Sequence, residues 1–116
     1  PKMIEVALGA GLGASVRYLM TQVLKSRTRV FPWATFIINI TGALLLGFLH
    51  NKSTSSHILL LLGTGFLGGY TTFSTFQVEL VTLINNNKQK MMFIYLLLTV
   101  LCGILAAYCG SWLGKL

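Results

Sequence analysis

The centre of the sequence reads Leu62-Gly63-Thr64-Gly65-Phe66-Leu67-Gly68-Gly69-Tyr70-Thr71-Thr72-Phe73-Ser74-Thr75-Phe76. The Gly68-Gly69 pair stands inside an apolar run and adjoins a series of β-branched and hydroxyl-bearing residues. Glycine has a low helix propensity, and threonine hydroxyls compete with the helix for backbone hydrogen bonds. The pattern therefore predicts a helix with a break near residues 68–72.

This run belongs to the third of four apolar stretches, each long enough to provide the roughly 20 helical residues that cross a bilayer core. The sequence lacks the alternation of a transmembrane strand, so helices are the expected spanning elements. We predict an all-α integral membrane protein with four transmembrane helices, the third broken in mid-membrane, and with both chain ends on one side. A single transmembrane domain fills residues 1–116, with spans at about 3–24, 33–50, 57–84 and 90–113.

The composition also indicates a membrane protein. Hydrophobic residues make up 54% and charged residues 9% of the chain, whereas about a quarter of a soluble domain is charged. The net charge of +7 comes mainly from Lys and Arg between the apolar runs, where they face lipid headgroups. The sequence has no basic stripe with interleaved aromatic residues, so we do not expect nucleic-acid binding. No room remains for a catalytic domain, so we expect a multi-pass protein of a microbial cell membrane and not an enzyme.

The predicted break has a functional and a structural interpretation. Unpaired backbone groups are tolerated at membrane depth only where they are buried in protein or line a polar cavity. A broken helix near the midplane is a common way to build an ion site, because it frees carbonyls and helix ends. The alternative is a flexible hinge or a patch for close helix packing.

Two polar residues lie inside the first two spans. Arg17 follows Gly9 and Gly13 on one small-residue stripe, which favours a position facing protein. A charged side chain in a membrane usually marks a pathway or a partner, and the alternative is snorkelling from near the helix end. Asn39 lies in the middle of the second span, where its amide can donate to an anion or make an interhelical hydrogen bond.

The last two spans carry aromatic and hydroxyl residues at helical spacing. Phe73 and Phe76 share one helix face that Glu79 continues, and aromatic ring edges are positive. They line a path for a small anion or are plain core and lipid-facing residues. Tyr95 and Thr99 lie one turn apart, so their hydroxyls form a polar rail, or Tyr95 is an interfacial anchor.

The run from Gly65 to Phe76 closely resembles the signature of the Fluc fluoride channels, also called the CrcB family. The resemblance covers the whole chain, including its size, the four spans, an Arg in the first span and an Asn in the second. It implies an antiparallel, dual-topology dimer with two pores that exports fluoride passively. The partner is then a second copy of the chain or a homologous subunit.

The resemblance also implies roles for individual residues. Backbone carbonyls of Gly68 and Thr71 are implied to hold a structural Na⁺ at the dimer interface. Two positions depart from the family pattern, because Tyr70 stands where Phe is frequent and Gly103 where a further hydroxyl is expected. The implied vestibule consists of Arg17, Thr35 and Glu79, and the implied fluoride pore of Phe73, Phe76, Asn39, Ser74, Thr75, Tyr95 and Thr99.

The main alternative function is that of a small four-helix proton-coupled multidrug exporter. Such an exporter needs a carboxylate deep in a helix, and Glu5 is too shallow, which leaves Glu79 as the candidate. A purely structural membrane subunit would not explain the Gly/Thr break.

The charges beside the spans predict insertion in both orientations. Orientation follows the Lys and Arg count near the span ends. With Arg17 set aside as intramembrane, one side of the membrane is expected to carry Lys2, Lys52 and Lys115, and the other Lys25, Arg27, Arg29, Lys88 and Lys90. This near-balance favours both orientations, and the alternative is that the small bias fixes one.

Overall fold

A computed structural model of the chain describes residues 2–24, 31–51 and 56–116. Lys25, Arg27, Arg29 and Lys52, on which the comparison of charges depends, lie outside the described residues. Within these ranges the secondary structure is helical and contains no strand. The elements are α1 (Lys2–Leu24), α2 (Trp33–Asn51), α3 (Ser56–Ile58), the π-helical segment η1 (Leu59–Leu67), α4 (Gly68–Tyr70), α5 (Ser74–Asn85) and α6 (Gln89–Gly114).

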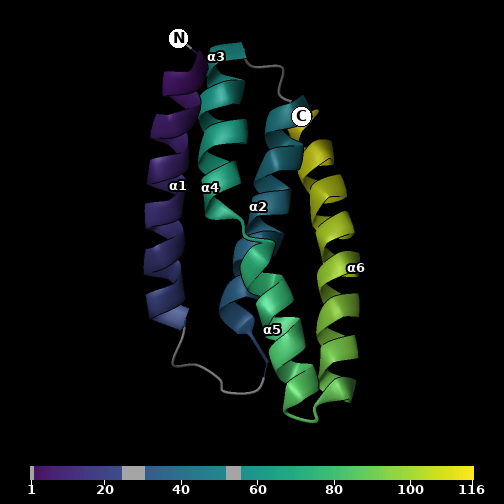
Figure 1. Cartoon of the computed structure of the whole chain (residues 1–116). Helices are drawn as coiled ribbons and strands as arrows, with labels where there is room; N and C mark the ends of the chain where they lie inside the picture. Colours follow the sequence, from purple (N-terminus) through teal and green to yellow (C-terminus); the bar gives the residue numbers. More distant parts are fainter. Residues whose placement is uncertain (1, 25–30, 52–55) are drawn as a thin grey trace.

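The helices run along the long axis of an elongated bundle that measures 47 × 28 × 21 Å. Among the described residues, α1, α2 and α6 are each long and apolar enough to cross a membrane. The run from α3 to α5 follows the same axis in successive pieces, and both termini lie at one end (Figure 1). The chain is therefore an all-α membrane protein.

Glycines allow α1 to pack closely against η1. A Cβ atom at Gly9 would lie 2.1 Å from the carbonyl oxygen of Leu61, and one at Gly13 would lie 1.9 Å from that of Phe66. Such distances leave no room for a side chain, so both glycines are needed for this contact. The stripe thus brings two backbones together, as small residues do in membrane helix pairs.

A second glycine-lined contact joins α2 to α6. A Cβ atom at Gly110 would lie 1.9 Å from the carbonyl oxygen of Leu44, and one at Gly47 would lie 2.3 Å from that of Ala107. At the upper end of the same pair, Asn51 Nδ2 donates hydrogen bonds to the carbonyl and hydroxyl oxygens of Ser111. The bundle therefore consists of two closely packed pairs, α1 with η1 and α4, and α2 with α6.

The buried core is small and consists of two clusters, the first where these pairs meet and the second between α5 and α6. One cluster consists of Ile38, Leu67 and Tyr70, and the other of Phe76, Leu83 and Tyr95. Large apolar side chains elsewhere point outward, as Leu8, Leu12 and Leu19 do on α1. A soluble protein would bury such faces, whereas lipid or a protein partner covers them in a membrane.

The helical run breaks at Thr71, Thr72 and Phe73, slightly later than the sequence suggested. Gly68 and Gly69 are both helical in α4, and Thr71 is the first extended residue, with ψ at 159°. Gly69 serves close packing, because a Cβ atom there would lie 2.2 Å from the carbonyl oxygen of Ala10. The glycine pair therefore marks the neighbourhood of the break without being its immediate cause.

The turn between α5 and α6 follows the expected polar connection. Asn87 adopts a left-handed conformation with φ at 58°, which asparagine tolerates better than most residues. The amide of Lys88 donates to the carbonyl of Leu83, so the chain reverses within a few residues.

Candidate functional site

The side chain of Asn39 pairs with the backbone of the break. Its Nδ2 atom donates to the carbonyl oxygen of Thr72 at 3.0 Å, and its Oδ1 atom accepts from the Thr72 amide at 2.9 Å. Thr72 is itself buried. The amide of Asn39 therefore makes an interhelical contact, and its Nδ2 atom keeps a second N–H outside this pair of bonds.

This pairing redirects the backbone hydrogen bonds around Gly68. In a continuous helix the amide of Thr72 would donate to the carbonyl of Gly68, four residues earlier. Here that amide donates to Asn39, while the amide and hydroxyl of Thr71 both donate to the carbonyl of Leu67 at 2.9 Å. The Asn39 side chain thus replaces the next turn of the helix at the point where the helix stops.

A pocket of about 620 Å³, here called the central pocket, lies beside the break. It brings together six of the predicted site residues, from α2, α4, the break, α5 and α6. These are Asn39, Gly68, Thr71, Phe73, Phe76 and Thr99.

The two phenylalanines of the central pocket differ in their environment. Their ring centroids are 6.2 Å apart, so they are neighbours as their spacing predicts. Phe76 is 7% exposed and packs edge-on against Tyr95 at 5.0 Å, whereas Phe73 is 69% exposed in the single chain. Phe76 is therefore a core residue as well as a pocket residue.

Thr99 supplies a hydroxyl to the central pocket. Its Oγ1 atom is buried and makes no hydrogen bond to the described part of the chain. Buried polar atoms are nearly always paired, so an unpaired hydroxyl that lines a pocket is suited to a ligand. Gly103 lies one turn further along α6 and offers no such group.

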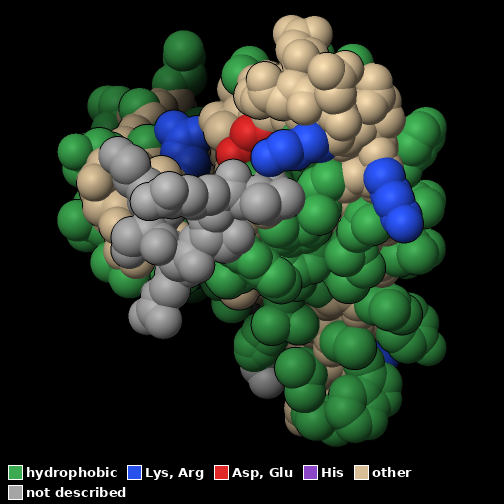
Figure 2. Space-filling view, turned by 90° about the horizontal axis from the view of Figure 1, so that it is seen from below, with side chains coloured by type: hydrophobic (Ala, Val, Ile, Leu, Met, Phe, Trp, Pro, Cys, Tyr) green, Lys and Arg blue, Asp and Glu red, His purple; other side chains and the backbone are tan. Residues whose placement is uncertain are grey.

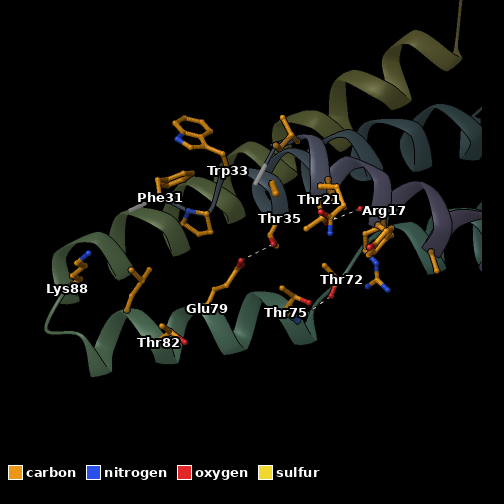
Figure 3. Close-up of a pocket in the computed structure, with 18 of the residues that line it drawn as sticks. Arg17, Thr21, Phe31, Trp33, Thr35, Thr72, Thr75, Glu79, Thr82 and Lys88 are labelled. Carbon is orange, nitrogen blue, oxygen red and sulfur yellow. Dashed lines mark hydrogen bonds between the residues drawn. The ribbon is translucent and has the colours of Figure 1, made fainter. Parts of the chain in front are cut away.

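A second pocket of about 570 Å³, here called the end pocket, opens at the end of the bundle where α1 finishes and α6 begins. Arg17, Thr35, Thr75 and Glu79 line it, together with Lys88 nearer the turn (Figure 3). Seen from this end, acidic atoms lie between basic side chains (Figure 2). Thr72 lines both pockets, so the two adjoin at the break.

Glu79 is at the centre of a hydrogen-bonded group in this region. Its Oε2 atom accepts from the Thr35 hydroxyl at 3.1 Å (Figure 3), and its Oε1 atom accepts from the Tyr95 hydroxyl at 2.8 Å. Tyr95 had been expected on the same polar rail as Thr99. In the structure its hydroxyl donates to the carboxylate of Glu79, and the shared rail stays a prediction.

The remaining predicted residues occupy different positions. Arg17 is half-buried on α1 and lines the end pocket. Thr75 lines the end pocket and not the central one, and its amide donates to Thr72 Oγ1 at 3.2 Å. Ser74 is exposed on α5 and is not among the lining residues of either pocket.

Sequence reasoning missed two residues of the site. The sequence marks Thr72 only as a helix-weakening residue, although its backbone is the partner of Asn39. Phe31 has no role in the sequence-based predictions, although it lines the end pocket and contacts Tyr95. Its position directly before Pro32 and Trp33, at the entry to the second span, was the available signal.

Comparison with known proteins identifies the family. A family model described as CrcB-like protein, Camphor Resistance (CrcB), matches residues 4–111. The chain belongs to the CrcB family. A relative from Ligilactobacillus salivarius (strain UCC118) is 93% identical over 114 residues, which cover 98% of this chain and 100% of the relative.

Two further CrcB relatives are more distant. One from Listeria innocua is 50% identical over 110 residues, covering 94% of this chain and 93% of the relative. One from Clostridium acetobutylicum is 42% identical over 112 residues, covering 96% of each chain. The relatives from Ligilactobacillus and Listeria are named Fluoride-specific ion channel FluC 1, and that from Clostridium is named Fluoride-specific ion channel FluC 2. The family is one of ion channels and not of enzymes.

Proposed function

We propose that the chain is one subunit of a fluoride-selective channel that lets fluoride leave a bacterial cell passively. The observation that carries this proposal is the match, over essentially the whole chain, to relatives named as fluoride-specific ion channels. Two adjoining pockets that carry most of the predicted polar and aromatic residues support it.

The pockets support a fluoride path made mainly of neutral hydrogen-bond donors. Fluoride is small and strongly hydrated, so a selective path must replace its water with donors and positive ring edges. The central pocket offers the second N–H of Asn39, the unpaired hydroxyl of Thr99 and the rings of Phe73 and Phe76. Neutral donors also let the ion leave again, which conduction requires.

The hydrogen bonds to Glu79 adapt the end pocket to an anion. An isolated carboxylate would repel fluoride at the entrance. Thr35 and Tyr95 each donate to one oxygen of Glu79, which disperses its charge, and Arg17 and Lys88 line the same pocket. Fluoride would therefore enter past cationic side chains and a carboxylate whose oxygens already have donors.

The backbone beside the break fits a structural Na⁺. Gly68 and Thr71 both line the central pocket, and the amide that would normally bond the Gly68 carbonyl donates to Asn39. Carbonyl oxygens suit a hard cation, and these two residues would hold it. Bound there, Na⁺ would supply a fixed positive charge close to the anion path.

A second subunit is part of the proposal. Gly68 and Phe73 are exposed in the single chain, although both belong to the central pocket. An antiparallel second copy, or a homologous subunit, would cover this face and bring a second set of the same residues. Each of two pores would then have lining residues from both subunits.

Ion efflux from liposomes tests the proposed function. Purified protein in liposomes loaded with KF should release fluoride once valinomycin is added, and liposomes loaded with KCl should retain chloride under the same gradient. Equal rates for the two anions would refute selectivity.

The same preparation separates the channel from a proton-coupled exporter. An exporter would move an organic cation in exchange for protons that run down their gradient. It would also need its carboxylate free to exchange ligands, whereas both oxygens of Glu79 accept hydrogen bonds here. Cation accumulation without fluoride release would favour the exporter.

A further inference from the structure

Tyr95 is held between two phenylalanine rings from different parts of the chain. Its side chain is 0% exposed. Phe76 of α5 packs edge-on against it at 5.0 Å and 62°, and Phe31 packs edge-on against it at 5.3 Å and 80°. Tilted and edge-on ring pairs at such distances are favourable, so the phenol ring has contacts in two directions.

Phe31 is itself fixed by its neighbours. It precedes Pro32, and a residue before proline has a restricted backbone. Its carbonyl accepts from the amide of Trp33 at 2.8 Å, and its ring lies 4.5 Å from that of Trp33 and 5.5 Å from that of Phe36. Phe31 therefore has contacts of its own at the entry to α2 that hold its ring against Tyr95.

This support acts on a hydrogen bond within the proposed anion path. The hydroxyl of Tyr95 reaches Glu79 at 2.8 Å, and Phe31 and Glu79 line the same end pocket. Without the Phe31 ring, the phenol would gain space on the side of the α2 entry and could tilt away from Glu79. Of its two hydrogen bonds to described residues, the carboxylate would then keep the one from Thr35.

We infer that Phe31 is a positioning residue for fluoride passage, which acts by holding the Tyr95 hydroxyl on Glu79. The role assigned to Phe31 is support of the phenol ring and not contact with the ion. It fixes the phenol ring, the phenol satisfies one oxygen of the carboxylate, and the carboxylate no longer presents that oxygen to an incoming anion. The inference rests on the proposed function for its effect on flux, but not for its effect on Tyr95.

The test combines fluoride efflux from liposomes with matched variants. Phe31→Leu, which keeps apolar bulk and removes the ring, should lower fluoride flux about two- to ten-fold, the range that corresponds to one aromatic contact. Phe31→Tyr keeps the ring and should retain more fluoride flux than Phe31→Leu. Phe93→Leu is the control, because Phe93 lies on α6 two residues before Tyr95 and is 57% exposed.

Two further measurements separate positioning from a general structural effect. In a Tyr95→Phe background, the hydrogen bond to Glu79 is already absent, so Phe31→Leu should change flux less than about two-fold further. The ¹³Cζ NMR signal of the Tyr95 phenol, identified as the one of four tyrosine signals that Tyr95→Phe removes, should shift in Phe31→Leu and stay in place in Phe93→Leu.

The outcomes bear on the two proposals differently. An unshifted Tyr95 signal in Phe31→Leu, or an equal flux loss with and without the Tyr95 hydroxyl, would overturn the inference. If Phe31→Leu does not fold, the milder Phe31→Met is measured for the same signal. If the Tyr95 signal shifts in Phe31→Leu but the unmodified protein itself passes no fluoride, the positioning role is supported and the proposed function is refuted.

Discussion

Replacing Asn39 with leucine should loosen the break in the helical run. The substitution removes both hydrogen bonds to Thr72, at 3.0 Å and 2.9 Å, and leaves a buried amide and carbonyl without partners. An unsatisfied buried group costs about 1–3 kcal/mol, although hydrogen bonds between membrane helices average only about 0.6 kcal/mol. We therefore expect a loss of about 1–4 kcal/mol in stability for the pair.

Hydrogen exchange at the Thr72 amide measures the effect at its source. A local loss of about 1–2 kcal/mol corresponds to exchange that is roughly 5- to 30-fold faster. Asn39→Asp keeps the acceptor for the Thr72 amide but replaces the donor with an oxygen that faces the Thr72 carbonyl. Exchange at Thr72 should therefore stay slow in Asn39→Asp, while fluoride flux falls because a negative charge enters the proposed anion path.

Asn51→Leu is a matched control for the Asn39 variants. Asn51 also lies on α2 and also bonds another helix, but its partner is Ser111 near the opposite end of α6 from the turn. Its replacement should lower stability without changing exchange at Thr72. Unchanged exchange at Thr72 in Asn39→Leu would refute the role assigned to Asn39 at the break.

Three further predictions concern packing, the pore rings and topology. Gly13→Ala should lower the free energy of unfolding by about 1–3 kcal/mol, since its Cβ would lie 1.9 Å from a backbone oxygen of η1, whereas Gly11→Ala, with open space around it, should be neutral or slightly stabilising in the same thermal-unfolding assay. Phe76→Ile and Phe73→Ile should both reduce fluoride efflux, but only the buried Phe76 should cost stability, by about 1–2 kcal/mol; wild-type efflux in both would make the rings packing residues only. A single cysteine in residues 85–87 of a chain without its native cysteines should be labelled from outside the cell in roughly half of the molecules, and all-or-none labelling of a protein that is active when expressed alone would exclude dual topology.

Much of the fold follows from sequence patterns that have one physical solution. Long apolar stretches at membrane length require helices, and the Gly9 and Gly13 stripe indicated the close contact that α1 makes. The position of the break was less predictable. The Asn39 side chain, which comes from another helix, pairs with the backbone at the break, and the helix propensities of the local residues do not reflect that contact.

The candidate site could also be predicted only in part, because some of its contacts depend on how the helices pack. Helical spacing placed Phe73 beside Phe76 and suggested that Tyr95 and Thr99 share a polar rail. It did not show that Tyr95 bonds Glu79, because that bond depends on how α5 lies against α6. Phe31 and Thr72 were missed for a related reason, since an aromatic residue in a connection and a backbone group have no distinctive sequence signal.

The two glycine-lined helix pairs interleave along the chain. The partner of α1 lies beyond α2, and the partner of α2 is the last helix, while α1 and α2 contact each other much less. During synthesis from the N-terminus, the ribosome therefore delivers two helices that do not yet have their main neighbours. The first close interface becomes available only when Gly65 and Gly69 have emerged, and the second only when Gly110 has. No close pair of α1 with α2 forms early, so close packing begins with η1 and α4 and is complete only after the final span.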